Sequence, residues 1–399
     1  MLPAWLRQVD PLLRELSQRV TLLGAATPAN AREERVRLQG LAASGKAAVP
    51  AWEYVRRDMS VLRRQLDAVA SALHELRDEP LADLYMARVQ EWRLEASLCA
   101  CVGTKEASSL AARRFASFDA ETEAAADALA EDWILPHPDP PAASGPPTPG
   151  AETADARAPS PSEVRGLPRP TFNAAGGSGW GSEFLETDSP HPESLLSLLQ
   201  AEIGRRRIPF AVVVHPHLSA LAATGHQTVL VAAGRRIGPE TAHRTVLHEI
   251  EGHVLPRARA AHAPLAIFSV GTARSADEQE GYALVLEDRH HFLTPSRRRE
   301  LAGRYRAVRR MREGATFVDV VRDLAGVGID PREAVVMGER AFRGSDGTFP
   351  GLGRERVYLE SYLRVRARLS DVPDDEAVLA SGQIALDAIP ALRPWCAST

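Results

Sequence analysis

A proline- and glycine-rich segment divides this 399-residue chain into two parts. Eleven of the 29 prolines fall between Pro136 and Pro170, and the run G-G-S-G-W-G-S follows at 176–182. A segment of this composition cannot bury enough apolar surface to offset the entropy lost on ordering. The sequence therefore predicts a helical N-terminal region over 1–135, a flexible linker or insertion over 136–182, and a second folded unit over 183–399.

The overall composition is that of an ordinary globular protein. A hydrophobic share of 44% and a charged share of 25% are typical of folded domains. The net charge of −4 argues against nucleic-acid binding. No stretch approaches the ~20 apolar residues that span a bilayer, so a membrane protein is not expected. The three cysteines form no spaced pairs, which favours a reducing cytoplasm over secretion.

The N-terminal region carries apolar residues at the three- and four-residue spacing of amphipathic helices. Long helices are predicted over 56–77 and 81–102, with Pro80 in the turn between them. Asn30 is expected to cap an earlier helix. We expect these helices to pack onto the folded unit that follows the linker.

Two short strands and a long helix are predicted at the start of the second unit. The β-branched apolar runs at 210–215 and 227–232 are typical of strands, and we expect them to form a small sheet beside the helix. The sequence Gly-Pro-Glu at 238–240 favours a helix start, because proline suits the first turn. This helix is expected to run to Leu255 and to end at Pro256.

Helices dominate the rest of the chain. Ser275 and Glu278 form a capping-box pattern, which predicts a helix reaching to about Phe292. A glycine-rich loop is expected over 344–353. Further helical segments are predicted at 296–312, 315–325, 331–342, 354–369 and 374–388. The fold class is therefore α+β, predominantly α-helical, with a small β-sheet.

A candidate metal site lies within this second unit. The sequence H-E-I-E-G-H contains His248, Glu249 and His253, and Glu280 follows in Q-E-G-Y-A. Two imidazoles and one carboxylate are the ligands of many hydrolytic zinc ions, which keep one position open for a water whose pKa falls to about 7. Glu249 would then accept a proton from that water. The hypothesis is one zinc ion per chain, with Glu249 as acid/base.

The two histidines stand five residues apart, whereas the usual zinc helix places them four apart. In a regular α-helix a separation of five residues turns the side chains about 140° away from each other. Both can face one metal only if the helix contains a one-residue π-type bulge or unwinds locally, and Gly252 is a suitable place for that distortion. The spacing leaves open the alternative that both are ordinary histidines of a half-buried helix.

Several motifs resemble one known family. They are T-V-L-H-E-I-E-G-H at 245–253, H-A-P-L at 262–265 and Q-E-G-Y-A at 279–283. They resemble the bacterial QEGLA-motif proteins, once called flavohaemoglobin expression-modulating, which share a domain family with the microtubule-associated tyrosine carboxypeptidases. Further similar segments lie at 27–34, 84–91, 102–104, 340–344 and 356–363.

The resemblance implies a gluzincin-like zinc metallopeptidase core that removes a C-terminal residue, often an aromatic one. The family's metal ligands correspond to His248, His253 and Glu280, and its catalytic acid/base corresponds to Glu249. The implied partner is the C-terminus of a peptide or protein.

The sequence departs from the family pattern in two places. Glu251-Gly252 stand where Gly-Thr is usual, which puts an extra carboxylate near the metal, and Tyr282 replaces a leucine. Neither change removes a ligand, but both bear on substrate preference. An endopeptidase on the same metal site is one alternative. An aminopeptidase is another, because Glu251 could supply the acidic residue that binds the substrate's amino group. The alternative from another class is a non-catalytic regulatory or interaction protein.

A carboxypeptidase must also hold the free α-carboxylate of its substrate, which a planar guanidinium does with two hydrogen bonds. Arg343 is the first candidate, and Arg340 and Arg257 follow it. Tyr358 could donate a hydrogen bond to the carbonyl oxyanion. Taken singly, each arginine fits an ordinary surface residue better than a substrate ligand, whereas Tyr358 fits a core tyrosine equally well.

Overall fold

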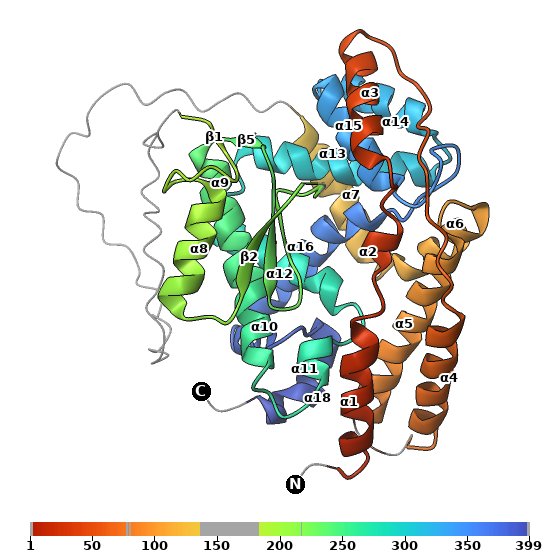
Figure 1. Ribbon diagram of the computed structural model, residues 1–399, viewed down its shortest axis with the longest axis vertical. Coiled ribbons are helices and arrows are strands. Elements are labelled where there is room, and N and C mark those ends of the chain that lie inside the picture. Colours follow the sequence, from red (N-terminus) through yellow and green to blue (C-terminus); the bar gives the residue numbers. More distant parts are fainter. Residues whose placement is uncertain (1–2, 77–78, 80, 136–182, 217, 397–399) are drawn as a thin grey trace, which may run out of the picture.

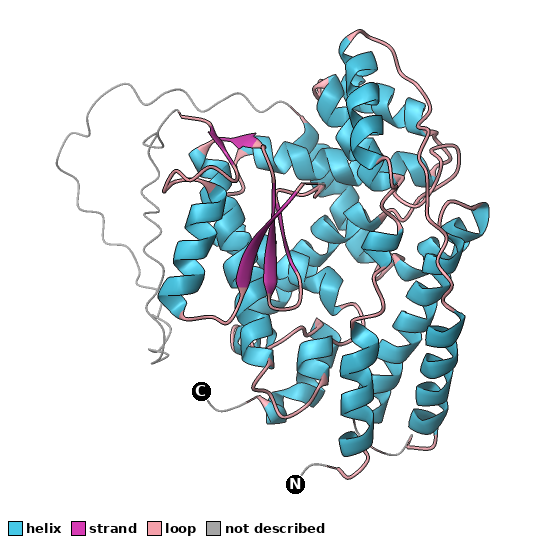
Figure 2. Ribbon diagram, in the orientation of Figure 1, coloured by secondary structure: helices cyan, strands magenta, loops and turns pink. Residues whose placement is uncertain are grey.

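The structure is a computed structural model that describes residues 3–76, 79, 81–135, 183–216 and 218–396. The linker predicted over 136–182 lies outside these residues. Helices make up most of the described chain, with a few short strands among them (Figure 2). This confirms the predicted α+β, predominantly α-helical class. None of the described helices is both long and apolar enough to cross a membrane.

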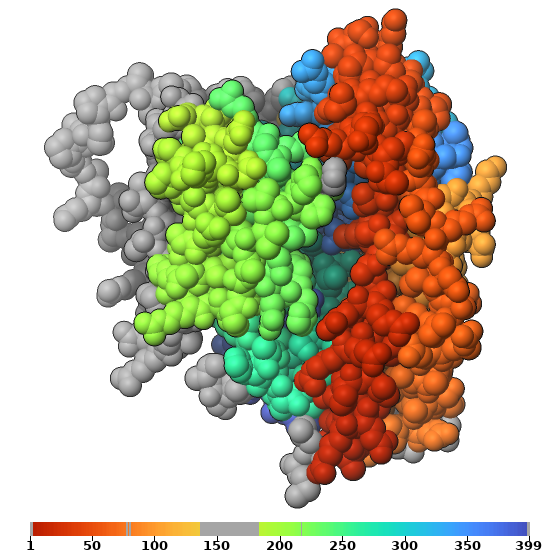
Figure 3. All heavy atoms as spheres, in the orientation of Figure 1, coloured from red at the N-terminus to blue at the C-terminus, as the bar shows by residue number. Residues whose placement is uncertain are grey.

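Helices α1 to α6 lie along one side of the molecule, whereas α7 lies toward its middle (Figure 1). Their bounds are α1 Leu6–Ser17, α2 Leu22–Ala25, α3 Ala31–Ala43, α4 Ser60–His74, α5 Ala82–Cys101, α6 Lys105–Arg114 and α7 Ala120–Ile134. In the space-filling view the surface is hollowed between these helices and the green region that follows the linker (Figure 3). One buried apolar cluster includes side chains from both parts of the chain, from Leu6 to Leu392.

Asn30 is the N-cap residue of α3, as predicted, but its side chain does not cap the helix. Its amide nitrogen donates to the carbonyl of Ala51 at 2.8 Å, and its amide oxygen accepts from the backbone N–H of Glu53 at 3.0 Å. Residues 51–59 are non-helical, so the helix predicted from residue 56 begins only at Ser60. Asn30 therefore holds the non-helical segment that precedes α4.

A three-stranded sheet lies beside the helix that carries the two histidines. Its strands β2 (Ala211–His215), β4 (Thr228–Ala232) and β3 (Ala222–Thr224) lie in that order, with β4 parallel to β2 and antiparallel to β3. The predicted strands correspond to β2 and β4. The strands β1 (Leu185–Glu186) and β5 (Arg236–Ile237) form a separate pair, and helix α8 spans Leu195–Arg206. Val229 and Val231 of β4 share a buried cluster with Val246 and Ile250.

The histidine-bearing helix starts where predicted and ends later. Helix α9 (Pro239–Leu247) has Gly238 as its N-cap and continues without a break into the π-helix η1 (His248–Val254) and then α10 (Leu255–Ala260). The predicted end at Pro256 is therefore wrong. Pro256 lies in the first turn after the π-helix, where the hydrogen-bonding pattern changes and its missing N–H is tolerated.

The C-terminal part is helical throughout. Its elements are α11 Ile267–Val270, α12 Ser275–Arg289, α13 Pro295–Arg312, α14 Phe317–Gly326, α15 Pro331–Ala341, η2 Arg354–Arg356, α16 Val357–Asp371, α17 Asp375–Leu379, η3 Leu386–Ala388, α18 Ile389–Leu392 and η4 Arg393–Trp395. The single helix predicted over 374–388 is interrupted after α17. The backbone of Gln383 bonds to Phe268 and Thr272 there, and these tertiary bonds replace helical ones.

Helix α12 begins as predicted at Ser275, but the predicted capping box is wrong. Its N-cap residue is Arg274, at a φ of 60°, and no side chain caps the helix. Glu278 is buried and pairs instead with Arg364 at 2.9 Å. Asp277 is also buried and pairs with Arg114 of α6 at 2.9 Å, so an N-terminal helix is joined by a buried ion pair to the start of α12.

Helix α12 fits tightly between η1 and α16. A Cβ atom on Gly281 would lie 2.4 Å from the carbonyl oxygen of Ser361 in α16. On the other side, a Cβ atom on Gly252 would lie 2.6 Å from that of Ala283. Both glycines are needed because the helices approach so closely, and this approach sets how near α12 comes to the histidines of η1.

Replacing Gly281 by alanine is expected to lower the free energy of unfolding by about 1–3 kcal/mol, because the added methyl group must push α12 away from α16. Gly40→Ala is the matched control. Gly40 lies inside α3, and a Cβ atom added to it would have nothing within 4 Å, so alanine there should add ~0.5–1 kcal/mol. Urea unfolding of both variants measures the difference. A Gly281→Ala protein as stable as the original would contradict the close contact.

Candidate metal centre

His248 and His253 face each other across one turn of η1. A π-helix forms hydrogen bonds between residues five apart, so side chains at that spacing come to the same side. The Nε2 atoms of the two rings are 3.3 Å apart. This confirms the helix irregularity predicted from the spacing. Gly252 lies inside the π-helix, but its role is the close packing against α12 rather than an unusual backbone angle.

Glu280 joins the two histidines from the first turns of α12. Its Oε2 atom lies 3.4 Å from Nε2 of His248 and 3.8 Å from Nε2 of His253. A tetrahedral zinc ion about 2.1 Å from each ligand separates the ligand atoms by about 3.4 Å. The three side chains therefore fit a zinc ion in both donor type and spacing, and they form a group that could hold a metal.

Glu287 fixes the orientation of the His248 ring by binding its Nδ1 atom. Its Oε1 atom accepts a hydrogen bond from Nδ1 of His248 at 2.7 Å, which leaves Nε2 of the neutral ring as the atom that can bind a metal. Glu287 is fully buried and is itself bound by Arg297 at 3.0 and 3.1 Å. Burial opposes its charge, yet Arg297 and His248 lower the pKa of Glu287 to about 2.

Glu287 was not identified from the sequence, although a signal was present. It follows Glu280 by seven residues, which is two helical turns, so both carboxylates lie on the same side of α12. In the metal-free protein these two carboxylates also shift the pKa of His248. Burial favours the neutral ring, but the hydrogen bonds with Glu280 and Glu287 outweigh it and raise the pKa of His248 to about 9. A metal ion would displace that proton.

Arg354 binds the other oxygen of Glu280. Its Nη2 atom donates to Oε1 of Glu280 at 2.9 Å, and its Nη1 atom donates to the hydroxyl of Tyr358 at 3.4 Å. Burial works against the charge of Glu280, but hydrogen bonds with both histidines and the charge of Arg354 hold its pKa well below the usual value. Arg354 was not identified from the sequence either. It directly follows the predicted glycine-rich loop, and nothing local distinguishes it from the many other arginines of the chain.

Glu249 lies against the sheet and is 6% exposed. Its Oε2 atom accepts a hydrogen bond from the hydroxyl of Thr224 at 2.7 Å. Thr224 is the last residue of β3, a strand that contacts η1. The carboxylate next to the candidate ligands is therefore positioned from a second element.

Arg343 differs from Arg340 in having no counter-ion among the described residues. Arg340 pairs with Glu355 at 2.9 Å, whereas the polar contact of Arg343 is with the hydroxyl of Ser219 at 3.4 Å. Burial, together with the nearby charge of Arg340, lowers the pKa of Arg343. A half-buried cation without a counter-ion gains from binding an anion, so Arg343 is better suited than Arg340 to hold a carboxylate.

Arg257 is the third arginine considered from the sequence. Its Nη1 atom lies 3.3 Å from the carbonyl oxygen of His253 and 3.5 Å from the amide oxygen of Gln279. Both partners are neutral, and burial lowers the pKa of Arg257. It therefore lies near the candidate ligands and also has capacity to bind an anion.

Glu251 and Tyr282, at the two departures from the family pattern, have polar partners other than the three candidate ligands. Glu251 is paired with Arg206 of α8, which also binds Glu202. Tyr282 is buried, and its hydroxyl donates to Glu376 at 3.3 Å. Glu251 is therefore already neutralised by an arginine, which weakens its case as a site for a substrate's amino group.

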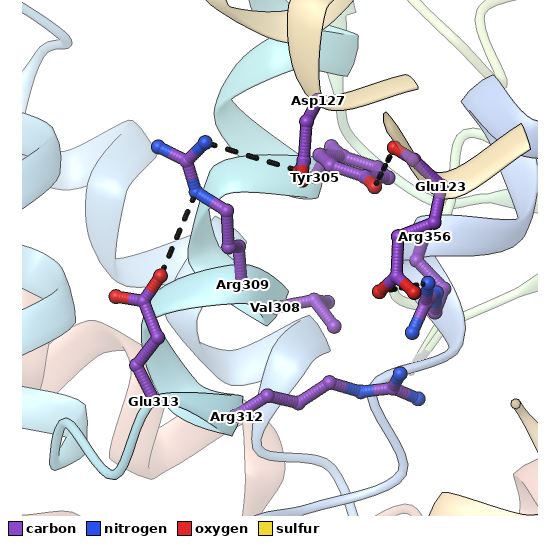
Figure 4. A pocket seen from close by; sticks show the side chains of 8 residues that line it. All are labelled: Glu123, Asp127, Tyr305, Val308, Arg309, Arg312, Glu313 and Arg356. Carbon is purple, nitrogen blue, oxygen red and sulfur yellow. Dashed lines mark hydrogen bonds and ion pairs between the residues drawn. The ribbon is translucent and has the colours of Figure 1, made fainter. Parts of the chain in front are cut away.

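A separate hollow of about 280 Å³ lies between α7 and α13 (Figure 4). None of the residues that line it is His248, His253 or Glu280. Arg309 and Arg356 at its edge are paired with carboxylates, among them Asp127 and Glu123. These pairs already balance its positive charge, so the hollow offers no evident anion site.

Comparison with known proteins identifies the family of the chain. No curated protein matches the chain significantly. Residues 186–398, more than half of the chain, match the family model described as microtubule-associated tyrosine carboxypeptidase. This match includes the two histidines, Glu249 and Glu280, and the chain therefore belongs to the microtubule-associated tyrosine carboxypeptidase family.

Proposed function

We propose that this protein is a zinc-dependent metallocarboxypeptidase that hydrolyses the C-terminal peptide bond of a peptide or protein. The observation that carries the proposal is the group of His248, His253 and Glu280, which has zinc-like spacing and an adjacent Glu249 in a member of a carboxypeptidase family. The H-E-x-x-x-H motif and the second motif, Q-E-G-Y-A, further support kinship with the bacterial QEGLA-motif proteins and a gluzincin-like core.

His248, His253 and Glu280 would hold one zinc ion per chain. When bound, the ion supplies a Lewis acid that polarises the scissile carbonyl and lowers the pKa of a water molecule. Glu249 accepts the proton of the attacking water and delivers it to the leaving amine. Its hydrogen bond from Thr224 fixes one carboxylate oxygen and leaves the other available for this transfer.

The remaining residues bind the substrate. Tyr358 donates its hydroxyl hydrogen to the carbonyl oxygen as negative charge develops there. Arg343 holds the α-carboxylate with two parallel hydrogen bonds. Arg257 is the second candidate, and Arg340 the third because Glu355 already binds it. The family description favours a C-terminal tyrosine, which agrees with an aromatic residue at the cleaved end. We place the reaction in the cytoplasm.

The test is a library of peptides with different C-termini, digested by the purified protein and analysed by mass spectrometry. We expect loss of a single C-terminal residue, fastest for aromatic ends, no reaction in the presence of a chelator, and recovery on addition of zinc. Matched peptides with amidated C-termini should resist cleavage, because they lack the carboxylate that the arginine binds.

The alternatives predict different products. Shortening from the N-terminus would indicate an aminopeptidase, and cleavage within amidated peptides an endopeptidase. A zinc-loaded protein that leaves every peptide intact would contradict the enzymatic proposal and favour a regulatory role.

A further inference from the structure

We infer that Arg354 is a positioning residue that couples the candidate ligand Glu280 to the hydroxyl group of Tyr358. The inference rests on the proposed function, because it assigns Glu280 to the metal and Tyr358 to the substrate carbonyl. It adds a residue that neither the motifs nor the family description identifies. The two contacts of the Arg354 guanidinium group carry it.

The first contact determines how Glu280 binds. A carboxylate has two oxygens, and only Oε2 of Glu280 faces both histidines, at 3.4 and 3.8 Å. Nη2 of Arg354 holds Oε1 at 2.9 Å, and the two side chains are 14% and 13% exposed. Arg354 thus keeps Oε1 occupied, so that Glu280 presents a single oxygen toward the histidine nitrogens.

The second contact determines what Tyr358 can do. Arginine carries only hydrogen-bond donors, so the oxygen of Tyr358 must accept from Nη1 of Arg354. The hydroxyl hydrogen of Tyr358 is then free for another acceptor, and none is found for it among the residues that the structure describes. Arg354 therefore leaves Tyr358 able to donate a hydrogen bond, which is the role proposed for it toward the substrate carbonyl.

Arg354 is itself held by a turn with little freedom. It is the first residue of η2, directly after Gly353, whose φ of 60° lies in the region that favours glycine. A Cβ atom on Gly353 would lie 3.1 Å from Met311 and 3.2 Å from Val308 of α13. The turn is therefore packed against a long helix, and the guanidinium group is placed between Glu280 and Tyr358.

Its two contacts also explain why an arginine is needed. The guanidinium group donates from two separate nitrogens in a fixed plane, and each nitrogen serves a different partner. Lysine has one charged nitrogen on a flexible chain and lacks this fork. A lysine at position 354 can restore the contact with Glu280, but it cannot hold Glu280 and Tyr358 in the same arrangement.

The experiment compares Arg354→Met, Arg354→Lys, Tyr358→Phe and the double variant Arg354→Met/Tyr358→Phe in the full-length protein. Zinc affinity is measured by competition with a chromophoric chelator. The values of kcat and KM are measured at saturating zinc with a peptide that the unmodified protein cleaves. Arg366→Met is the matched control. Arg366 donates to the hydroxyl of Tyr362 at 3.0 Å, also four residues away, but it is exposed and away from the candidate ligands.

We expect Arg354→Met to weaken zinc binding by ~10–100-fold, as is typical for the loss of a residue that orients a ligand. Tyr358→Phe should leave zinc affinity unchanged. At saturating zinc both single variants should lower kcat by about 100-fold with little change in KM, and the double variant should fall no lower than Arg354→Met. Arg354→Lys should recover zinc affinity more fully than kcat, and Arg366→Met should match the original protein.

Three results would overturn the inference. The first is an Arg354→Met protein with the zinc affinity and kcat of the unmodified protein. The others are a loss of kcat in the double variant that equals the product of the two single losses, or losses in Arg366→Met as large as those in Arg354→Met. Thermal unfolding of each variant shows whether the helix has been disturbed, and Arg354→Lys provides a milder change if Arg354→Met does not fold. An unmodified protein that binds zinc but cleaves no peptide contradicts the proposed function instead. In that case the zinc affinity of Arg354→Met still decides the contact with Glu280.

Discussion

Glu249→Gln is expected to keep its zinc and to lose ~10²–10⁴-fold in kcat, the usual contribution of a general acid/base. The amide has nearly the shape of the carboxylate, and its oxygen can still accept the hydrogen bond that Thr224 donates at 2.7 Å. It cannot take a proton from water. Because Glu249 is not one of the three candidate ligands, metal content should be unaffected. Peptide trimming at saturating substrate and elemental analysis of the same sample measure the two quantities.

Glu251→Gln provides the matched control for this variant. Glu251 lies two residues further along the same π-helix, but it is paired with Arg206 of α8. Its replacement should change kcat by no more than a few-fold. A Glu249→Gln protein with most of its activity would contradict the role of the acid/base, and one that loses its zinc would instead make Glu249 a ligand.

The distorted helix of the site could be predicted from the sequence because its cause is local. Two histidines five residues apart can approach each other only if the helix is widened, and the structure has a π-helix over His248–Val254. The strands β2 and β4 could likewise be recognised, since each is a run of β-branched residues between turn residues. In these places the spacing and type of neighbouring residues were sufficient.

The sequence was insufficient where the partner of a side chain lies far along the chain. Glu278 matched a helix cap in the sequence, but the structure pairs it with Arg364, 86 residues away. Arg354 and Glu280 are 74 residues apart, and nothing local marks that arginine among its neighbours. Strand β3 has only three residues, so its hydrophobic pattern could not be detected, and the contact of Thr224 with Glu249 was missed with it.

His248→Ala is expected to abolish stoichiometric zinc binding. The original protein should contain about one zinc ion per chain, whereas the variant keeps only His253 and Glu280 of the three candidate ligands. Removing a ligand should weaken affinity by more than the ~10–100-fold typical of residues that only orient one. Elemental analysis after dialysis, together with chelator competition, measures the loss, and peptide trimming should disappear with the metal.

His74→Ala is the control for this second variant, because His74 is exposed at the end of α4. It should keep both zinc and activity. In His248→Ala the buried carboxylate of Glu287 loses its histidine but keeps Arg297, so the fold should survive and the loss of zinc can be attributed to the missing ligand. If a folded His248→Ala protein retained one zinc ion at the original affinity, the metal would have to bind elsewhere, and the roles proposed for Glu249 and Arg354 would lose their basis.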